Sequence, residues 1–195
     1  QQALGTPLKL ANKKNARRIV ALHLPKSNQF VIMQLACWMA DCAFMPLPLD
    51  WPLKRKRSVL FSAQCVLIVG NRLLDLPYTQ ILYNNQPLQN SLLKNFKPRE
   101  NQHAYSIFTS GSSGKAKGVI IGLAGLTQVI AQQKITVQLK EQQRSLWLHD
   151  IAFDASIADI WVSLSAGACL VAKPQATPAQ LGKIIREQNI HYIDL

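Results

Sequence analysis

The sequence predicts an α/β fold in which mostly parallel sheets are covered by helices, and two observations support this class. First, short apolar runs alternate along the chain with longer segments of helical character. Second, the runs are almost continuously apolar, as expected for parallel strands that are buried on both faces. A hydrophobic content of 48% over 195 residues is enough for a packed core and argues against global disorder.

Each predicted strand is a short apolar run bounded by polar residues, Pro or Gly. The strands are expected at residues 19–24, 65–70, 105–110, 119–121, 145–148, 168–172 and 191–195. The last run reaches the end of the chain, so we expect an exposed strand edge there, which would lower solubility.

Helices are expected between these strands. Ser27 or Asn28 can begin a helix that continues to Met39, and Pro178 suits the first position of a late helix capped by Thr177. Further helices are expected at residues 53–63 and 124–135. Three prolines in residues 44–52 predict an extended segment that is neither a helix nor a central strand, and residues 71–103 are expected to be irregular.

The charge balance, 22 basic against 10 acidic residues, gives a net charge of +12. Such an excess favours an anionic partner, or it is a local imbalance in part of a larger protein. The basic run at residues 54–57 lies on a predicted helix and is interpreted as a solvated face. The longest apolar stretch, residues 30–45, is interrupted by Gln34 and Asp41 and is too short to span a membrane. We therefore expect neither a nucleic-acid nor a membrane partner.

Cysteine and histidine patterns give no metal-site signature. The four cysteines fit no CxxC pattern and are expected to be buried thiols in a reducing, cytoplasmic compartment: Cys37, Cys42, Cys65 and Cys169. The four histidines form no HxxxH pair, so no metal ligand is assigned. His149 and Asp150 are adjacent in a predicted strand, so their side chains should point to opposite faces and not act as a pair.

The stretch FTSGSSGKAKGV, residues 108–119, combines three glycines with four hydroxyl side chains and two lysines. The backbone N–H groups of such a loop can cradle an anion, and the lysines add positive charge. It matches neither the Walker pattern nor GxGxxG. Composition alone leaves two interpretations open, a phosphate cradle and a flexible surface hairpin.

As a whole string, this stretch resembles the phosphate-loop signature of the adenylate-forming superfamily, [YF]TSG[ST]TGxPKG. Ser113 stands where Thr is usual, and Ala116 replaces the usual Pro. Residues 40–55 are similar to the GAAYVPLDPxYPxxR segment of the family, although Asp41, Pro48 and Leu49 depart from it. The segment at residues 153–171 is similar to FDxSxxEIxxxLxxGaxLv, which occurs in the amino-acid-activating domains of nonribosomal peptide synthetases.

The resemblance implies that a carboxylate attacks the α-phosphate of ATP, that Mg²⁺ bridges the phosphates and that pyrophosphate leaves. The acyl group would then pass to the phosphopantetheine thiol of a carrier protein. By residue-by-residue match, the β- and γ-phosphates would be held by Thr109, Ser110, Gly111, Ser112, Ser113, Gly114 and Lys117. Lys115 falls at a variable position of the family and carries less weight.

The same resemblance assigns the amino-acid substrate site. Asp154 would pair with the α-ammonium group of the substrate, Phe153 would pack beneath it, and two small residues, Ala155 and Ala158, would line the side-chain pocket. An alternative role for Asp154 is a helix N-cap, which does not exclude substrate contact. Asp159, at a position where the family often has Glu, is expected to be structural.

Several segments of the family have no counterpart here, among them the ribose-binding Asp and a late catalytic Lys. We therefore expect residues 1–195 to be an incomplete N-terminal part of an AMP-binding domain that lacks the C-terminal part and is inactive by itself. Two alternatives remain: an acyl-CoA or fatty-acyl-AMP ligase, in which Asp154 would be left without a cation, and a degenerate, non-catalytic remnant. Nucleic-acid binding rests on the net charge alone and ranks last.

Overall fold

The structure is a computed structural model that describes residues 18–83, 99, 101–110, 116–173 and 178–194. The chain divides into two compact units. The first unit comprises residues 1–24 and 28–124, and the second comprises residues 25–27 and 125–195. Each unit has its own sheet and its own helices, and they are considered in turn.

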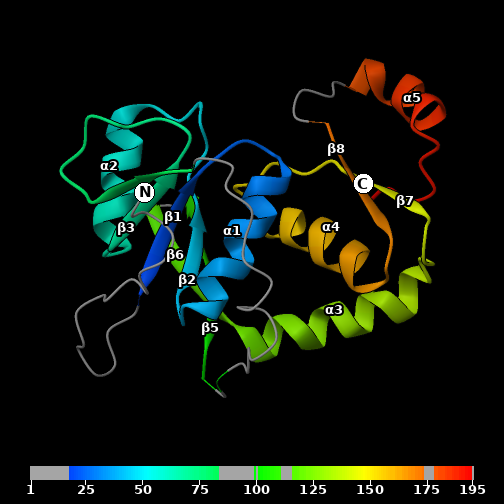
Figure 1. The fold of residues 1–195 in the computed structure, drawn as a ribbon, viewed down its shortest axis with the longest axis horizontal. Coiled ribbons are helices and arrows are strands. Elements are labelled where there is room, and N and C mark those ends of the chain that lie inside the picture. Colours follow the sequence, from blue (N-terminus) through cyan, green and yellow to red (C-terminus); the bar gives the residue numbers. More distant parts are fainter. Residues whose placement is uncertain (1–17, 84–98, 100, 111–115, 174–177, 195) are drawn as a thin grey trace. The chain divides into compact units, whose positions relative to one another are not determined.

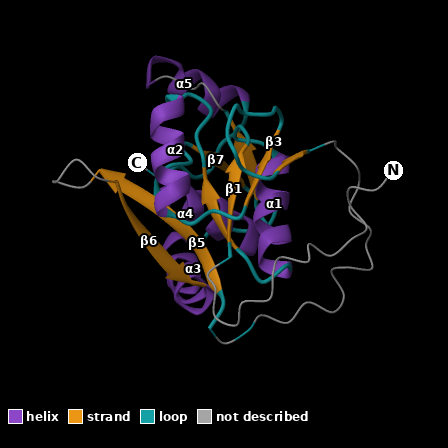
Figure 2. Cartoon of the chain, turned by 90° about the vertical axis from the view of Figure 1, so that its left-hand side faces the viewer, coloured by secondary structure: helices purple, strands orange, loops and turns teal. Residues whose placement is uncertain are grey.

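The first unit is built on a six-stranded sheet with the order β4-β3-β1-β2-β5-β6 (Figure 1). Its strands are β1 (Ile19–His23), β2 (Ala43–Pro46), β3 (Leu67–Gly70), β4 (Gln80–Leu82), β5 (His103–Ser110) and β6 (Ala116–Gly122). Neighbouring strands are parallel except for β5 and β6, which are antiparallel. Figure 2 shows these two running side by side as a long hairpin. The expected parallel α/β architecture is confirmed.

Helices α1 (Asn28–Met39) and α2 (Leu53–Ser62) cover opposite faces of this sheet. The alternation of side chains along β2 decides which residue meets which helix. Phe44 points toward α1, where its ring lies 6.5 Å from that of Phe30 and 5.9 Å from that of Trp38. Its neighbours Ala43 and Met45 belong to a buried cluster on the other face that includes residues 59 and 60 of α2. The apolar side chains of β2 therefore pack against helices on both faces of the sheet.

The proline-rich segment corrects one expectation, because β2 is an internal strand of the sheet despite ending in Pro46. The amides of Ala43 and Leu47 donate to carbonyls on the β1 side, at 2.8 and 3.0 Å. Since successive amides of a strand point to opposite sides, the nitrogen of Pro46 faces β5, whose register with β2 includes only Phe44 and Tyr105. The missing N–H of Pro46 thus costs no hydrogen bond to β1.

Two further expectations for the first unit are wrong in part. The segment expected to be irregular contains strand β4, which pairs with β3 at the edge of the sheet. Within the basic run on α2, Lys56 is only 4% exposed, and its Nζ donates to the carbonyl of Leu49 at 2.9 Å. The other three basic residues of the run are exposed, as a solvated face requires.

The second unit has a two-stranded parallel sheet, β7 (Arg144–Trp147) with β8 (Cys169–Ala172). Its helices are α4 (Asp154–Ser165), α5 (Pro178–Glu187) and most of α3 (Leu123–Val137). Helix α4 lies against both strands. The strand expected at residues 191–195 is reduced to a single bridge between Tyr192 and Ser145 in the described residues, so the chain segment lies beside β7 without forming a regular strand.

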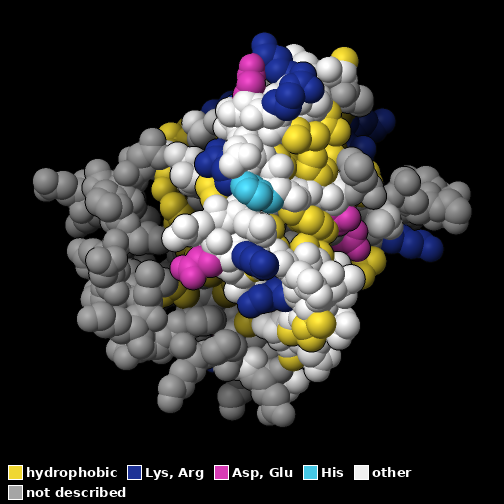
Figure 3. All heavy atoms as spheres, turned by 90° about the vertical axis from the view of Figure 1, so that its right-hand side faces the viewer, with side chains coloured by type: hydrophobic (Ala, Val, Ile, Leu, Met, Phe, Trp, Pro, Cys, Tyr) yellow, Lys and Arg dark blue, Asp and Glu magenta, His cyan; other side chains and the backbone are white. Residues whose placement is uncertain are grey.

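The cysteines follow the expected pattern with one exception. Cys37, Cys42 and Cys65 are buried, and burial raises the pKa of the Cys42 and Cys65 thiols to about 11. Contrary to expectation, Cys169 is exposed. It is the first residue of β8, an edge strand that pairs with β7 on one side only. No helix in the described parts of the chain is long and apolar enough to cross a membrane. On the face drawn in Figure 3, Lys and Arg side chains are interspersed with hydrophobic and acidic ones.

Candidate functional site

The glycine-rich stretch connects β5 to β6, and its two ends are held by the antiparallel pairing of these strands. Thr109 lies directly opposite Lys117, and Ser110 lies opposite Ala116. Side chains of directly opposed residues point to the same face of a hairpin. The Thr109 hydroxyl and the Lys117 ammonium, both on exposed residues, therefore lie on one face at the base of the loop. The expected phosphate-binding residues Gly111, Ser112, Ser113 and Gly114 fall outside the described residues.

Gly118, next to Lys117, is required for packing and not for an unusual backbone angle. It lies opposite Phe108 in the hairpin. A Cβ atom at this position would lie 2.7 Å from Cζ of the Phe108 ring, closer than real Cβ atoms come to a neighbour. Since Phe108 is buried in the core cluster of the first unit, its ring has little room to move away. The absence of a side chain at Gly118 thus leaves room for the Phe108 ring.

The expected substrate residues lie at the start of α4 in the second unit. Asp154 is the first residue of the helix, and its Oδ1 accepts a hydrogen bond from the amide of Ala155 at 3.0 Å. The N-cap residue is Phe153, with φ −107° and ψ 147°, so the alternative role of Asp154 as N-cap is wrong. A carboxylate in the first turn is nonetheless favoured by the positive end of the helix dipole.

Exposure separates these residues into two groups. Asp154 is exposed, and Phe153 is 63% exposed, so its ring is largely open to solvent. Ala155 and Ala158 are half-buried. A spacing of three residues puts the two alanines on the same side of α4. The helix start therefore combines an accessible carboxylate, an accessible aromatic ring and two small residues.

Polar contacts in the interior of the second unit hold α4 against β7. The indole Nε1 of Trp147 donates to Oγ of Ser156 at 2.8 Å, and Oγ of Ser163 donates to Oγ of Ser145 at 2.8 Å. All four residues are buried. Because buried polar groups must find partners, these bonds fix both the rotation of α4 and its position along β7. Because Asp154 is the first residue of α4, these bonds also fix its position in the second unit.

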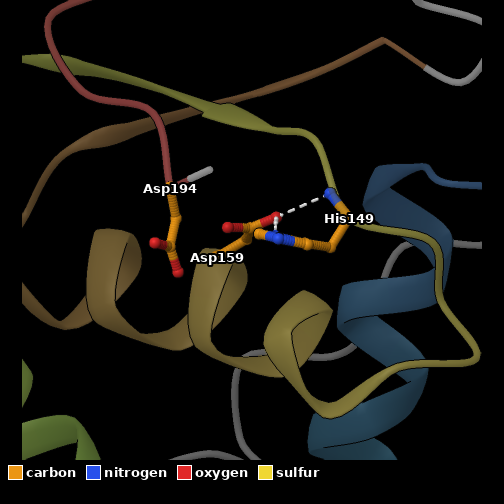
Figure 4. A group of neighbouring side chains, drawn as sticks. All are labelled: His149, Asp159 and Asp194. Atoms are coloured by element: carbon orange, nitrogen blue, oxygen red, sulfur yellow. Dashed lines mark hydrogen bonds and ion pairs between the residues drawn. The ribbon is translucent and has the colours of Figure 1, made fainter.

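A third polar contact involves Asp159, which is 3% exposed. Its Oδ2 accepts hydrogen bonds from the amides of Leu148 and His149, at 3.1 and 3.0 Å, and lies 3.1 Å from Nδ1 of His149 (Figure 4). Burial raises the pKa of the Asp159 carboxyl, while the bonds and charge of His149 and the bond from Leu148 oppose that shift. The structural role expected for Asp159 fits this geometry, since it ties α4 to the chain segment that follows β7.

The partner of His149 is therefore Asp159 and not the adjacent Asp150. The expectation that His149 and Asp150 do not pair agrees with this contact, but the sequence pattern does not predict the partner ten residues further on. The available signal was an acidic residue within the apolar face of α4, between Ile157 and Ile160, which are both buried. A carboxylate at such a place requires hydrogen-bond donors from another element.

Lys26 adds a cation close to this region. Its Nζ donates to the carbonyl of Leu148 at 2.7 Å and to that of Trp147 at 3.4 Å, and it lies 5.8 Å from the centroid of the Trp147 ring. Burial lowers the pKa of the Lys26 ammonium, and the charges of Asp150 and Asp159 raise it. Sequence analysis gave Lys26 no role.

Comparison with known proteins adds a separate line of evidence. Residues 2–195 match the AMP-binding enzyme family. The chain is 30% identical over 202 residues to delta-poly-L-ornithine synthetase of Acinetobacter baumannii (strain AB307-0294), a match that covers 97% of this chain and 15% of the relative. It is 28% identical over 190 residues to a dimodular nonribosomal peptide synthase of Bacillus subtilis (strain 168), covering 89% of this chain and 8% of the relative.

Solved structures show the same architecture. The N-terminal subdomain of Klebsiella oxytoca NpsA, in complex with 3-hydroxyanthranilyl-AMSN, superposes with a TM-score of 0.78 at 26% identity, over 92% of this chain and 46% of that one. The four-domain nonribosomal peptide synthetase holo-AB3403, bound to AMP and glycine, superposes with a TM-score of 0.80 at 21% identity, over 91% of this chain and 14% of that one, and shows the likeness of fold alone. The family match spans almost every residue, and the chain therefore belongs to the AMP-binding enzymes.

Proposed function

We propose that this chain forms the N-terminal part of an adenylation domain of the nonribosomal peptide synthetase type. Its parent protein would activate an amino-acid carboxylate with ATP as an aminoacyl-adenylate. The observation that carries this proposal is the β5–β6 hairpin, where Thr109 and Lys117 stand opposite each other at the base of a glycine- and serine-rich loop. A hydroxyl and a cation on one face suit the phosphates of a nucleotide.

In this proposal, the hairpin binds the phosphates of ATP. Lys117 would neutralise phosphate charge, and the hydroxyls of Thr109 and Ser110 would donate to phosphate oxygens; in the proposal, Gly111, Ser112, Ser113 and Gly114 complete the cradle. Mg²⁺, when bound with ATP, supplies further neutralisation of the phosphate charge that develops as pyrophosphate leaves. Because this chemistry needs positioning and charge more than acid–base groups, the contribution of the hairpin is to hold the triphosphate in place.

The start of α4 would recognise the acid that is activated. Asp154 is exposed, and no ion pair to it occurs within the described ranges of the chain. In the proposal, the carboxylate receives the α-ammonium group of an amino acid, while Ala155 and Ala158 leave room for its side chain. An ammonium bound to a carboxylate is a charge-assisted pair that an acid without an amino group does not form.

Transfer to a phosphopantetheine thiol of a carrier protein, in the cytoplasm, completes the proposed function. Its support is the similarity to a delta-poly-L-ornithine synthetase and to a dimodular nonribosomal peptide synthase, of which this chain spans 15% and 8%. We propose that the carrier domain and the catalytic lysine belong to the remainder of the parent protein.

The test uses the full-length parent protein with ATP and Mg²⁺ and measures the exchange of labelled pyrophosphate into ATP across a panel of amino acids and fatty acids. We expect exchange with one or a few amino acids. The variant Asp154→Asn should reduce kcat/KM for the amino acid by about a hundredfold, as expected when a charged pair of about 3 kcal/mol is lost, and should leave the KM for ATP unchanged.

A matched control is Asp75→Asn, which removes an exposed carboxylate from the first unit. This variant should retain wild-type exchange. Exchange supported only by acids without an α-amino group would instead assign the protein to the acyl-CoA or fatty-acyl-AMP ligases. No exchange from folded parent protein would favour the non-catalytic remnant.

A further inference from the structure

The second unit brings together three side chains that lie far apart in the sequence: His149, Asp159 and Asp194 (Figure 4). Each comes from a different part of the unit. His149 follows β7, Asp159 lies in the second turn of α4, and Asp194 lies in the segment after α5. One potential ligand atom of each lies within 4.8 Å of the other two. The arrangement is therefore a product of the tertiary structure.

The carboxylate of Asp159 provides a second, independent observation. Its Oδ2 has three nitrogen neighbours, but its Oδ1 is buried and has no hydrogen-bond partner among the described residues. Figure 4 shows this free oxygen on the side of Asp194. A buried carboxylate oxygen that faces a second carboxylate is unfavourable unless a cation or a proton lies between them.

We propose that His149, Asp159 and Asp194 bind a divalent cation of the zinc class. One imidazole nitrogen and two carboxylate oxygens form a donor set that suits zinc and its first-row neighbours better than the all-oxygen sets of calcium or magnesium. In a tetrahedral zinc site with ligands about 2.0–2.2 Å from the ion, two ligand atoms lie about 3.3–3.6 Å apart. The three potential ligand atoms, which lie within 4.8 Å of one another, would therefore move closer together when the ion binds.

The site would join the three chain segments that surround α4. Tyr192, two residues before Asp194, already bridges to Ser145 of β7. An ion held by all three ligands would connect this segment to α4 and to the residues that follow β7. Lys26 lies nearby, but its ammonium donates hydrogen bonds to the carbonyls of Trp147 and Leu148. It does not donate to the free oxygen of Asp159.

The test titrates the chelator-treated full-length protein with Co²⁺ in the absence of ATP and substrate, so its result does not depend on the proposed enzymatic function. Co²⁺ reports its surroundings through visible absorption. We expect one equivalent to bind with nitrogen and oxygen ligation, and Zn²⁺ to displace it. The variant Asp194→Asn should weaken Co²⁺ binding by at least about tenfold.

The matched control is Asp150→Asn, which alters an exposed carboxylate next to His149 that is outside the cluster. Its Oδ1 accepts a bond from the amide of Ala152, which an asparagine oxygen can also do. This variant should bind Co²⁺ as the wild type does. If circular dichroism shows that Asp194→Asn is unfolded, His149→Gln replaces it in the same titration.

Three results would overturn the proposal. The first is the absence of a stoichiometric visible band in the wild type, which would mean that a proton and not a metal ion separates the two carboxylates. The second is equal binding by the wild type and the folded cluster variant. The third is intense thiolate-to-cobalt absorption, which would place the ion on a cysteine.

Discussion

At the scale of single residues, the hairpin shows how a glycine can be needed for a reason other than backbone flexibility. Gly111, Gly114 and Gly118 share one short stretch, but only the first two are expected to bind phosphate. In the structure, Gly118 is part of a regular strand and has no positive φ. Its lack of a side chain makes room for the Phe108 ring. The aromatic first position of the motif and its last glycine are therefore a packed pair.

This pairing predicts that Gly118→Ala destabilises the protein. The added methyl group would overlap the buried Phe108 ring, and overpacking of this kind costs about 1–3 kcal/mol. The free energy of unfolding in urea should fall by that amount. Gly125→Ala is the matched control, because it is an exposed helical position where nothing lies within 4 Å of the new Cβ. That variant should gain about 0.5–1 kcal/mol. Equal effects at the two positions would contradict the packing explanation.

At the scale of elements, the position of α4 depends on buried polar contacts with β7 as well as on apolar packing. The helix presents serine and aspartate to the sheet in addition to isoleucine and valine. Each of these polar groups meets a specific partner on or next to β7. Since hydrogen bonds are directional, they define the position of the helix more narrowly than apolar contact alone.

We therefore expect Ser156→Ala to destabilise the second unit more than the removal of a single hydroxyl oxygen would suggest. The substitution removes the acceptor of the buried Trp147 indole N–H, and a donor left without its acceptor costs about 1–3 kcal/mol. Chemical denaturation followed by tryptophan fluorescence measures this loss. Ser165→Ala is the control: Ser165 is exposed, and its hydroxyl donates to the carbonyl of Val162 in its own helix at 3.1 Å. A similar loss for both serines would refute the role of the Ser156 contact.

At the scale of the whole molecule, proton binding links buried groups to stability. His23 is fully buried at the end of β1, with Nδ1 3.0 Å from the carbonyl oxygen of Leu47. Burial lowers the pKa of His23 below its ordinary 6.5, the Leu47 bond raises it, and the charges of Lys56 and Arg72 lower it further. Below pH 6.5 the unfolded chain therefore takes up this proton more readily than the folded chain.

The free energy of unfolding should consequently decrease as the pH falls from 6.5 through the lowered pKa of His23. The variant His23→Gln can still donate to Leu47 but does not titrate. Its stability should depend less on pH than that of the wild type when both are denatured in urea between about pH 8 and pH 5. Parallel stability curves for the two proteins over this range would contradict the prediction.

The fold class and the position of most elements follow from the sequence. Short continuous apolar runs bounded by polar residues favour buried strands, and the pattern of Pro and polar residues predicts where α2 and α5 begin. The sequence also predicts site residues in the hairpin and at the start of α4, because their resemblance to the family is local and continuous. The family itself is confirmed by the match over residues 2–195.

Only the tertiary structure decided the features that depend on contacts between distant segments. Pro46 lies within an internal strand because its missing amide faces the side of β2 that makes few bonds. Lys56 is buried because a carbonyl at Leu49 accepts its ammonium. His149, Asp159 and Asp194 meet because β7, α4 and the segment after α5 converge. Local patterns record the preferences of neighbouring residues, whereas these contacts arise from the packing of whole elements, which no spacing along the chain expresses.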